Sequence, residues 1–182
     1  MAQRATEFTR TTPDRGRSTT VREEVRRGME ERPTTRRKVS PPKRTAAQIA
    51  SLGMGIASLS LGALAFVGPL VTGNRDKVIN LRKGKLFDVF AMNPLHAGIH
   101  IGLGLLGILA ARSQKASRGY LAVSSAGHAA LATTGILAGR KRSGIYEVMG
   151  MAMNTADNIL HSAWCGAAAL FAARPNLLQR AA

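Results

Sequence analysis

The sequence predicts an all-α membrane protein, in which a disordered basic tail precedes a bundle of four transmembrane helices. Two observations predict this fold. Four long apolar segments with almost no charged residues follow a polar N-terminal segment. In addition, one polar motif occurs twice, 61 residues apart, in the second and the fourth of these segments. Helices of soluble proteins normally carry a charged face, which these segments lack, so we expect them to lie in a bilayer.

Residues 1–46 form the predicted tail. They hold 13 of the 26 Lys and Arg residues and 6 of the 10 Asp and Glu residues, with very few aliphatic side chains. Such a segment buries too little apolar surface to offset the loss of chain entropy on folding, so we expect disorder. A basic cluster near its end is placed to face anionic lipid head groups: Arg36, Arg37, Lys38, Lys43 and Arg44. We favour the simpler interpretation that the tail is solvated and only sets topology.

The membrane domain is predicted at residues 47–174, followed by a short tail at 175–182. Its four spans are expected at residues 49–72, 89–111, 119–139 and 148–173, since a spanning helix needs roughly 20 apolar residues. With the N-terminus in the cytoplasm, 18 Lys and Arg residues lie on the side of the two termini and 8 on the other side. This distribution favours an inner-membrane protein with both termini in the cytoplasm.

The duplicated motif places an asparagine, a second polar residue and a histidine at positions i, i+3 and i+7. This spacing puts the three side chains of each copy on one face of a helix. We call the two sets together the polar stripe: Asn93, His96, His100, Asn154, Asp157 and His161. An offset of two helices predicts parallel repeats of a helix pair, related by an axis along the membrane normal. The stripe would then lie at the bundle centre, near the outer face of the membrane.

Two interpretations of the polar stripe remain open. Helix capping is the one we favour for the two asparagines and for Asp157, because Asn93 precedes Pro94 and because an acid near a helix N-terminus is favoured by the helix dipole. The alternative is a binding site for a metal ion such as Zn, or for protons, with four candidate ligands: His96, His100, Asp157 and His161. Hydrogen bonds between helices would equally explain the histidines, and we interpret His128 as a packing residue.

The two motif segments resemble the signature of a bacterial family of four-helix integral membrane proteins of unknown function. The pattern Asn-Pro-Leu-His followed by a second histidine matches Asn93 to His100. The pattern Asn-x-Ala-Asp-Asn-x-Leu-His matches Asn154 to His161. The resemblance covers residues 49–174 and leaves the N-terminal tail outside. It implies the four-helix membrane fold and a bacterial source, and it implies no activity.

From the sequence we expect a non-catalytic membrane protein with a structural or stress-related role and no cofactor. A nucleophile with a recognisable turn and base is not found, and neither is a phosphate-binding loop, so we expect no enzyme. A metal-ion or proton binding and transport module is the first alternative. Binding of anionic lipid or nucleic acid through the basic tail is the second, and Phe8 as the only aromatic residue of the tail argues against nucleic acid.

Association of copies of the chain is also open. The sequence contains Gly-xxx-Gly patterns, such as Gly98 with Gly102 and Gly135 with Gly139. Small residues at this spacing let two helices approach closely. We favour close packing within one chain over formation of a homo-oligomer.

Overall fold

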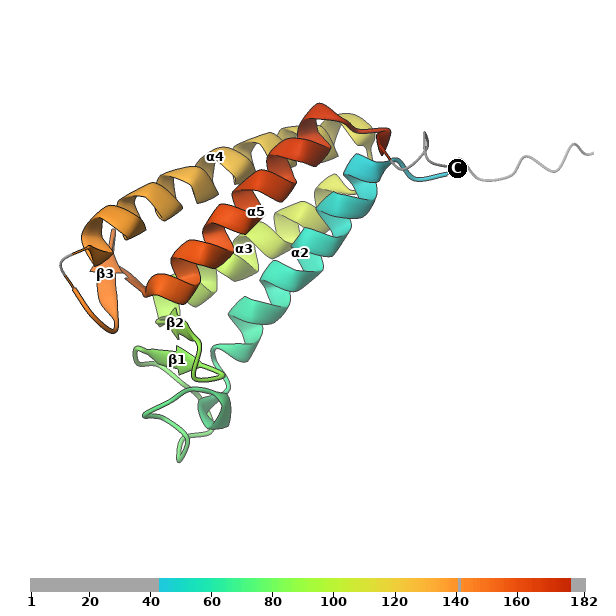
Figure 1. Ribbon diagram of the computed structural model, residues 1–182. Helices are drawn as coiled ribbons and strands as arrows, with labels where there is room; N and C mark the ends of the chain where they lie inside the picture. The colour runs from blue at the N-terminus through green and yellow to red at the C-terminus, as the bar shows by residue number, and fades with distance from the viewer. Residues whose placement is uncertain (1–42, 141, 178–182) are drawn as a thin grey trace, which may run out of the picture. The chain divides into compact units, whose positions relative to one another are not determined.

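The structure is a computed structural model that describes residues 43–140 and 142–177 (Figure 1). The described residues form four α-helices: α2 at Ala46–Leu64, α3 at Pro94–Ala110, α4 at Gln114–Gly139 and α5 at Thr155–Ala173. Helix α2 packs mainly on α3, and α4 packs mainly on α5. The chain reverses direction between successive helices, so the start of α2 and the end of α5 lie at the same end of the bundle (Figure 1). Most of the predicted tail, residues 1–42, lies outside the described residues.

Two small β-hairpins lie at the other end of the bundle, which we call the hairpin end. Strand β1 (Gly84–Leu86) pairs with β2 (Phe90–Met92) before α3, and β3 (Tyr146–Val148) pairs with β4 (Met151–Met153) before α5. Both pairs are antiparallel, and β2 contacts β4. Each half of the described chain therefore has the order helix, hairpin, helix. A short 3-10 helix, η1 at Gly68–Leu70, precedes the first hairpin.

The first hairpin turns through two residues with positive φ, Phe87 and Asp88. The Asp88 carboxylate accepts a hydrogen bond from the Thr72 hydroxyl and pairs with Arg75. These two contacts lower the pKa of Asp88 below its ordinary value, so the carboxylate stays ionised and holds the exposed turn against the chain that follows η1.

The helices are shorter than the predicted spans at the hairpin end. The first predicted span reaches residue 72, but α2 ends at Leu64; the second and fourth begin five and seven residues before α3 and α5 do. The apolar residues outside the helices are buried in the hairpins instead, for example Leu86, Met92 and Met153. A short apolar run has the same composition in a buried strand as in a helix, so the sequence did not distinguish them. The expectation of a purely helical fold is corrected accordingly.

The helix starts follow the predicted capping. The Asn93 side chain accepts a hydrogen bond from the His96 N–H at 3.0 Å, with Pro94 in the first turn. The Asn154 side chain accepts from the Asp157 N–H at 3.0 Å, and Asp157 Oδ2 accepts from the Asn154 N–H at 2.8 Å. This reciprocal pair is a capping box and satisfies backbone donors that the helix leaves unpaired. Capping by both asparagines and by Asp157 is confirmed.

Polar side chains of the helices point inward, and large apolar ones point outward. The buried polar side chains of the helices are Ser51, Ser58, His96, His100, Ser117, Ser124, His128, Asp157, Asn158 and His161. By contrast, Leu106 is 58% exposed, Val123 is 72% exposed and Ile159 is 67% exposed. Two of the helices, α2 and α4, are long and apolar enough to cross a membrane.

Close contact between α2 and α3 depends on glycines without side chains. A Cβ on Gly104 would lie 2.4 Å from the Leu59 backbone N, whereas one on Gly102 of the same helix would meet no heavy atom within 4 Å. A Cβ on Gly62 would lie 2.5 Å from the Ala97 backbone O. The backbones of α2 and α3 therefore approach at distances that any side chain would prevent.

We predict that Gly104→Ala lowers the free energy of unfolding by about 1–3 kcal/mol, because the added methyl group forces the two helices apart. Gly102→Ala is the matched control, and it should be neutral or slightly stabilising because alanine favours the helix. Thermal unfolding of the detergent-purified proteins, followed by circular dichroism, measures both. Equal midpoints for the two variants would contradict the close packing described here.

Candidate metal centre

The four histidines of the chain gather inside the bundle toward the hairpin end. His96 and His100 lie on α3, His128 on α4 and His161 on α5, and each is at most 3% exposed. The ring centroids of His161 lie 5.7 Å from His96, 6.3 Å from His100 and 5.3 Å from His128. One ligand nitrogen from each of His96, His100 and His161 lies within 4.8 Å of the others. We call these three residues the histidine centre.

The His96 ring is oriented by two backbone carbonyls. Its Nδ1 lies 3.1 Å from the Ala91 O and 2.9 Å from the Ala152 O. Both partners only accept, so Nδ1 carries the proton and donates it. In the neutral ring Nε2 then has a lone pair, and this atom is buried without a hydrogen-bond partner among the described residues. Metal-binding histidines commonly donate the opposite N–H to a carbonyl, as this ring does.

Ser58 of α2 positions the His100 ring in a similar way. The Ser58 Oγ lies 3.0 Å from His100 Nδ1 and donates to the His100 backbone O at 3.0 Å. Since the hydroxyl proton is used on the carbonyl, the arrangement is completed by a His100 Nδ1–H that donates to Ser58 Oγ. The lone pair of His100 then lies on Nε2, as in His96.

His161 and His128 complete the group. His161 Nδ1 is buried and has no hydrogen-bond partner in the described part of the chain. His128 Nδ1 lies 2.7 Å from the Ser124 backbone O, to which it donates. The His128 ring stacks on Trp164 with centroids 5.6 Å apart and meets His161 edge-on. The structure therefore places His128, which we interpreted as a packing residue, beside the histidine centre.

Asp157 stands outside the histidine centre. Its Oδ2 accepts from the Asn154 N–H and also from the Ala91 N–H of β2, at 3.0 Å. The carboxylate therefore ties the start of α5 to the first hairpin. Of the four candidate ligands in the sequence, the structure brings together the three histidines and uses Asp157 as a cap.

The two halves exchange hydrogen bonds at equivalent positions. Asn93 Nδ2 donates to the Gly150 O in the second hairpin at 2.8 Å. Asn154 Nδ2 donates to the Val89 O in the first hairpin at 2.7 Å. Each donor and each acceptor is separated from its counterpart by 61 residues. His96 and Asp157 are another such pair, and they bond to Ala152 and Ala91, which are again 61 residues apart.

Sequence reasoning missed the groups that orient the rings. Ser58 and Ser124 lie on α2 and α4, in spans where we singled out neither residue. The Ala152 carbonyl comes from a strand that was expected to be helical. Buried serines in otherwise apolar helices were the available signal.

Of the predicted basic cluster, Lys43 and Arg44 are described and are exposed beside the start of α2. They lie at the end of the bundle opposite the hairpins (Figure 1). Arg36, Arg37 and Lys38 lie outside the described residues.

Fold and site together define a class: a four-helix bundle with an apolar exterior, a polar interior and a buried group of histidines. Residues 48–174 match the model of a family described as "Domain of unknown function (DUF4383)", and the chain belongs to this family. Comparison with curated proteins and with solved structures finds no match. Membership of a family of unknown function is thus confirmed over nearly the range expected from the sequence, while the motif pattern and the bacterial source stay predictions.

We predict that Asp157→Ala lowers the free energy of unfolding by about 2–4 kcal/mol. The substitution leaves two buried N–H groups, of Ala91 and Asn154, without their acceptor, and each such loss costs about 1–3 kcal/mol. Glu147→Ala is the control, because its contact with Lys83 is exposed and should contribute below about 1 kcal/mol. Chemical unfolding in detergent measures both, and similar stabilities would argue against the role assigned to Asp157.

Proposed function

We propose that this chain is a four-span integral membrane protein that binds one transition-metal ion at the histidine centre. The proposal has two parts, a location in the bilayer and a binding function. A different observation supports each part, so each can be tested separately.

The inverted distribution of polarity supports the bilayer location. Large apolar side chains cover the outside of the helices, and serine, histidine and asparagine side chains fill the inside. In water the exposed apolar surface would be unfavourable, whereas lipid accepts it and forces polar groups inward. Helix α5 is less apolar in sequence, but Asp157, Asn158 and His161 are all buried, so its outer face is apolar as well.

Helix lengths fit a bilayer core of about 30 Å. The shortest helix, α3, has 17 residues, which at ~1.5 Å per residue is close to the lower limit for a span. The Ala47 N–H donates to the Pro175 O at 3.2 Å, so both ends of the bundle's chain lie on one side. We assign that side to the cytoplasm of a bacterial inner membrane, which directs the hairpins and the nearby histidines to the outer face.

The unpaired ring nitrogens support the binding function. A buried polar atom without a partner is unfavourable, by roughly 1–3 kcal/mol. His96 Nε2 and His161 Nδ1 are two such atoms in the described chain, and they belong to rings that converge on one point. A metal ion bound by the three nitrogens would satisfy both, and imidazole suits Zn, Cu, Fe and Ni.

The proposal includes no catalytic step. The three histidines would hold the ion, Ser58 and the carbonyls of Ala91 and Ala152 would keep the rings in place, and His128 would stand where a further ligand or a proton acceptor is needed. Storage, sensing or transport of the ion all fit this arrangement. A purely structural membrane protein, whose histidines only join helices, is the competing function.

Elemental analysis of the full chain, purified in detergent and then offered Zn²⁺, Fe²⁺ and Cu⁺ or Cu²⁺, tests the binding function. We expect about one ion per chain, and its loss in the His100→Ala/His161→Ala variant while circular dichroism still reports helices. A wild-type protein that retains none of these ions would leave the structural function. Resistance of the chain to extraction from membranes by carbonate tests the location separately.

A pair of serine variants tests the same site without removing a ligand. Ser58→Ala should weaken metal affinity by about 10–100-fold, because the His100 ring loses the group that orients it. Ser51→Ala is the matched control, since Ser51 is a buried serine of the same helix that donates to the Gly107 O at 2.8 Å and touches no histidine. Competition against a chelator of known affinity measures both. Equal affinities would show that Ser58 does not position a ligand.

A further inference from the structure

The described charges at the end of the bundle opposite the hairpins are all positive, and we call this the basic end. It carries six basic residues: Lys43, Arg44, Arg112, Lys115, Arg118 and Arg174. The ion pairs found among the described residues, by contrast, lie in the loop after η1 and in the hairpins. The basic end therefore has positive charge that no described carboxylate neutralises.

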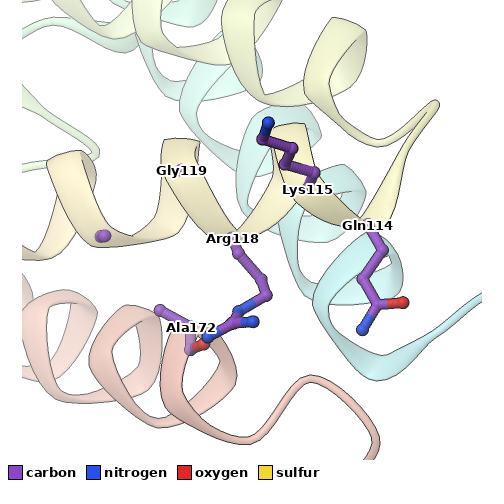
Figure 2. A pocket seen from close by; sticks show the side chains of 6 residues that line it. Gln114, Lys115, Arg118, Gly119 and Ala172 are labelled. Carbon is purple, nitrogen blue, oxygen red and sulfur yellow. The ribbon is translucent and has the colours of Figure 1, made fainter.

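A groove of about 540 Å³ opens at the basic end between the start of α4 and the end of α5 (Figure 2). Its lining combines cationic and very small side chains: Gln114, Lys115, Arg118, Gly119, Ala122 and Ala172. A Cβ on Gly119 would meet no heavy atom within 4 Å, so the space above this turn is open.

Arg118 is held in position at the rim of this groove. Its Nε donates to the Ala172 O at 3.0 Å, which leaves the two terminal nitrogens of the guanidinium as further donors (Figure 2). Lys115 extends from the preceding turn of α4 in a different direction (Figure 2). Two cations thus border the groove, one of them anchored to the neighbouring helix.

The face of α4 that carries the groove changes character along the helix. Positions 115, 118, 119 and 122 follow helical spacing on one exposed side, with the cations in the first turns and small apolar residues after them. Val123, next to this side, is 72% exposed. A molecule with a negatively charged group and an apolar tail matches this sequence of surfaces better than a free anion does.

We propose that this groove binds an anionic phospholipid of the surrounding bilayer, with the phosphate at Arg118 and Lys115 and an acyl chain along Gly119 and Ala122. Charge-assisted hydrogen bonds from a guanidinium to phosphate oxygens are strong, and basic residues beside a span attract anionic lipid. The inference rests on the membrane location proposed above and is independent of the metal ion.

Native mass spectrometry of the full chain in detergent, titrated with phosphatidylglycerol or phosphatidylcholine, tests this inference. We expect the wild type to prefer phosphatidylglycerol and Lys115→Gln/Arg118→Gln to bind it at least tenfold more weakly. Lys77→Gln/Arg82→Gln is the control, because it removes the same charge from exposed residues of the loop before the first hairpin. An equal loss in the control would mean that net charge alone attracts the lipid and would overturn the site.

Two further measurements separate the remaining explanations. Displacement of phosphatidylglycerol by millimolar inorganic phosphate would identify a site for free phosphate and overturn the lipid assignment. Metal content and carbonate resistance are measured on the same variants, and we expect both to be unchanged by Lys115→Gln/Arg118→Gln. Loss of lipid preference in a chain that stays in the membrane thus counts against the groove alone, whereas a chain extracted by carbonate counts against the proposed location.

Discussion

The rest of the structure depends on the capping box at the start of α5. Asp157 Oδ2 accepts from the N–H of Asn154 in its own helix and from the N–H of Ala91 in the opposite hairpin. One buried carboxylate oxygen therefore fixes where α5 begins and where the first hairpin lies against it. Because β2 is held there, the Ala91 carbonyl of the same residue is available to the His96 ring. Local helix capping and the orientation of a candidate ligand are consequently coupled through a single residue.

Burial of polar groups gives this fold its specificity. Lipid tails are as apolar as leucine, so apolar contact alone does not determine which faces of two helices meet. Here the faces are selected by serine and histidine side chains that reach backbone carbonyls, and by glycines that let the backbones approach. Ser51, for instance, bonds to the Gly107 O of α3, and a Cβ on Gly107 would lie 2.9 Å from Gly55 of α2. Hydrogen bonding and steric fit select the same helix faces.

The helical elements and the polar stripe were predictable from the sequence because long uncharged runs and the i, i+3, i+7 spacing are local signals. The hairpins were not, since Leu86, Met92 and Val148 are apolar whether they lie in a strand or in a span. Histidines 96, 100 and 161 share a motif, and the repeat suggested their meeting. His128 has no counterpart in that motif, and only the packing of α4 on α5 brings it to them. Ser58 was missed for the same reason, because its role depends on a contact 42 residues away.

The exchange of hydrogen bonds between the hairpins has a consequence for the relation of the two halves. Asn93 reaches the turn before Asn154, and Asn154 reaches the turn before Asn93, at positions that correspond with a constant offset. Contacts in which residue i of one unit meets residue j of the other, and the reverse, define an isologous interface between two identical subunits. This chain therefore contains, within one polypeptide, the contact pattern of a symmetric homodimer. The departures from that symmetry, such as histidine at 96 against aspartate at 157, are what a fused pair can carry and a true homodimer cannot.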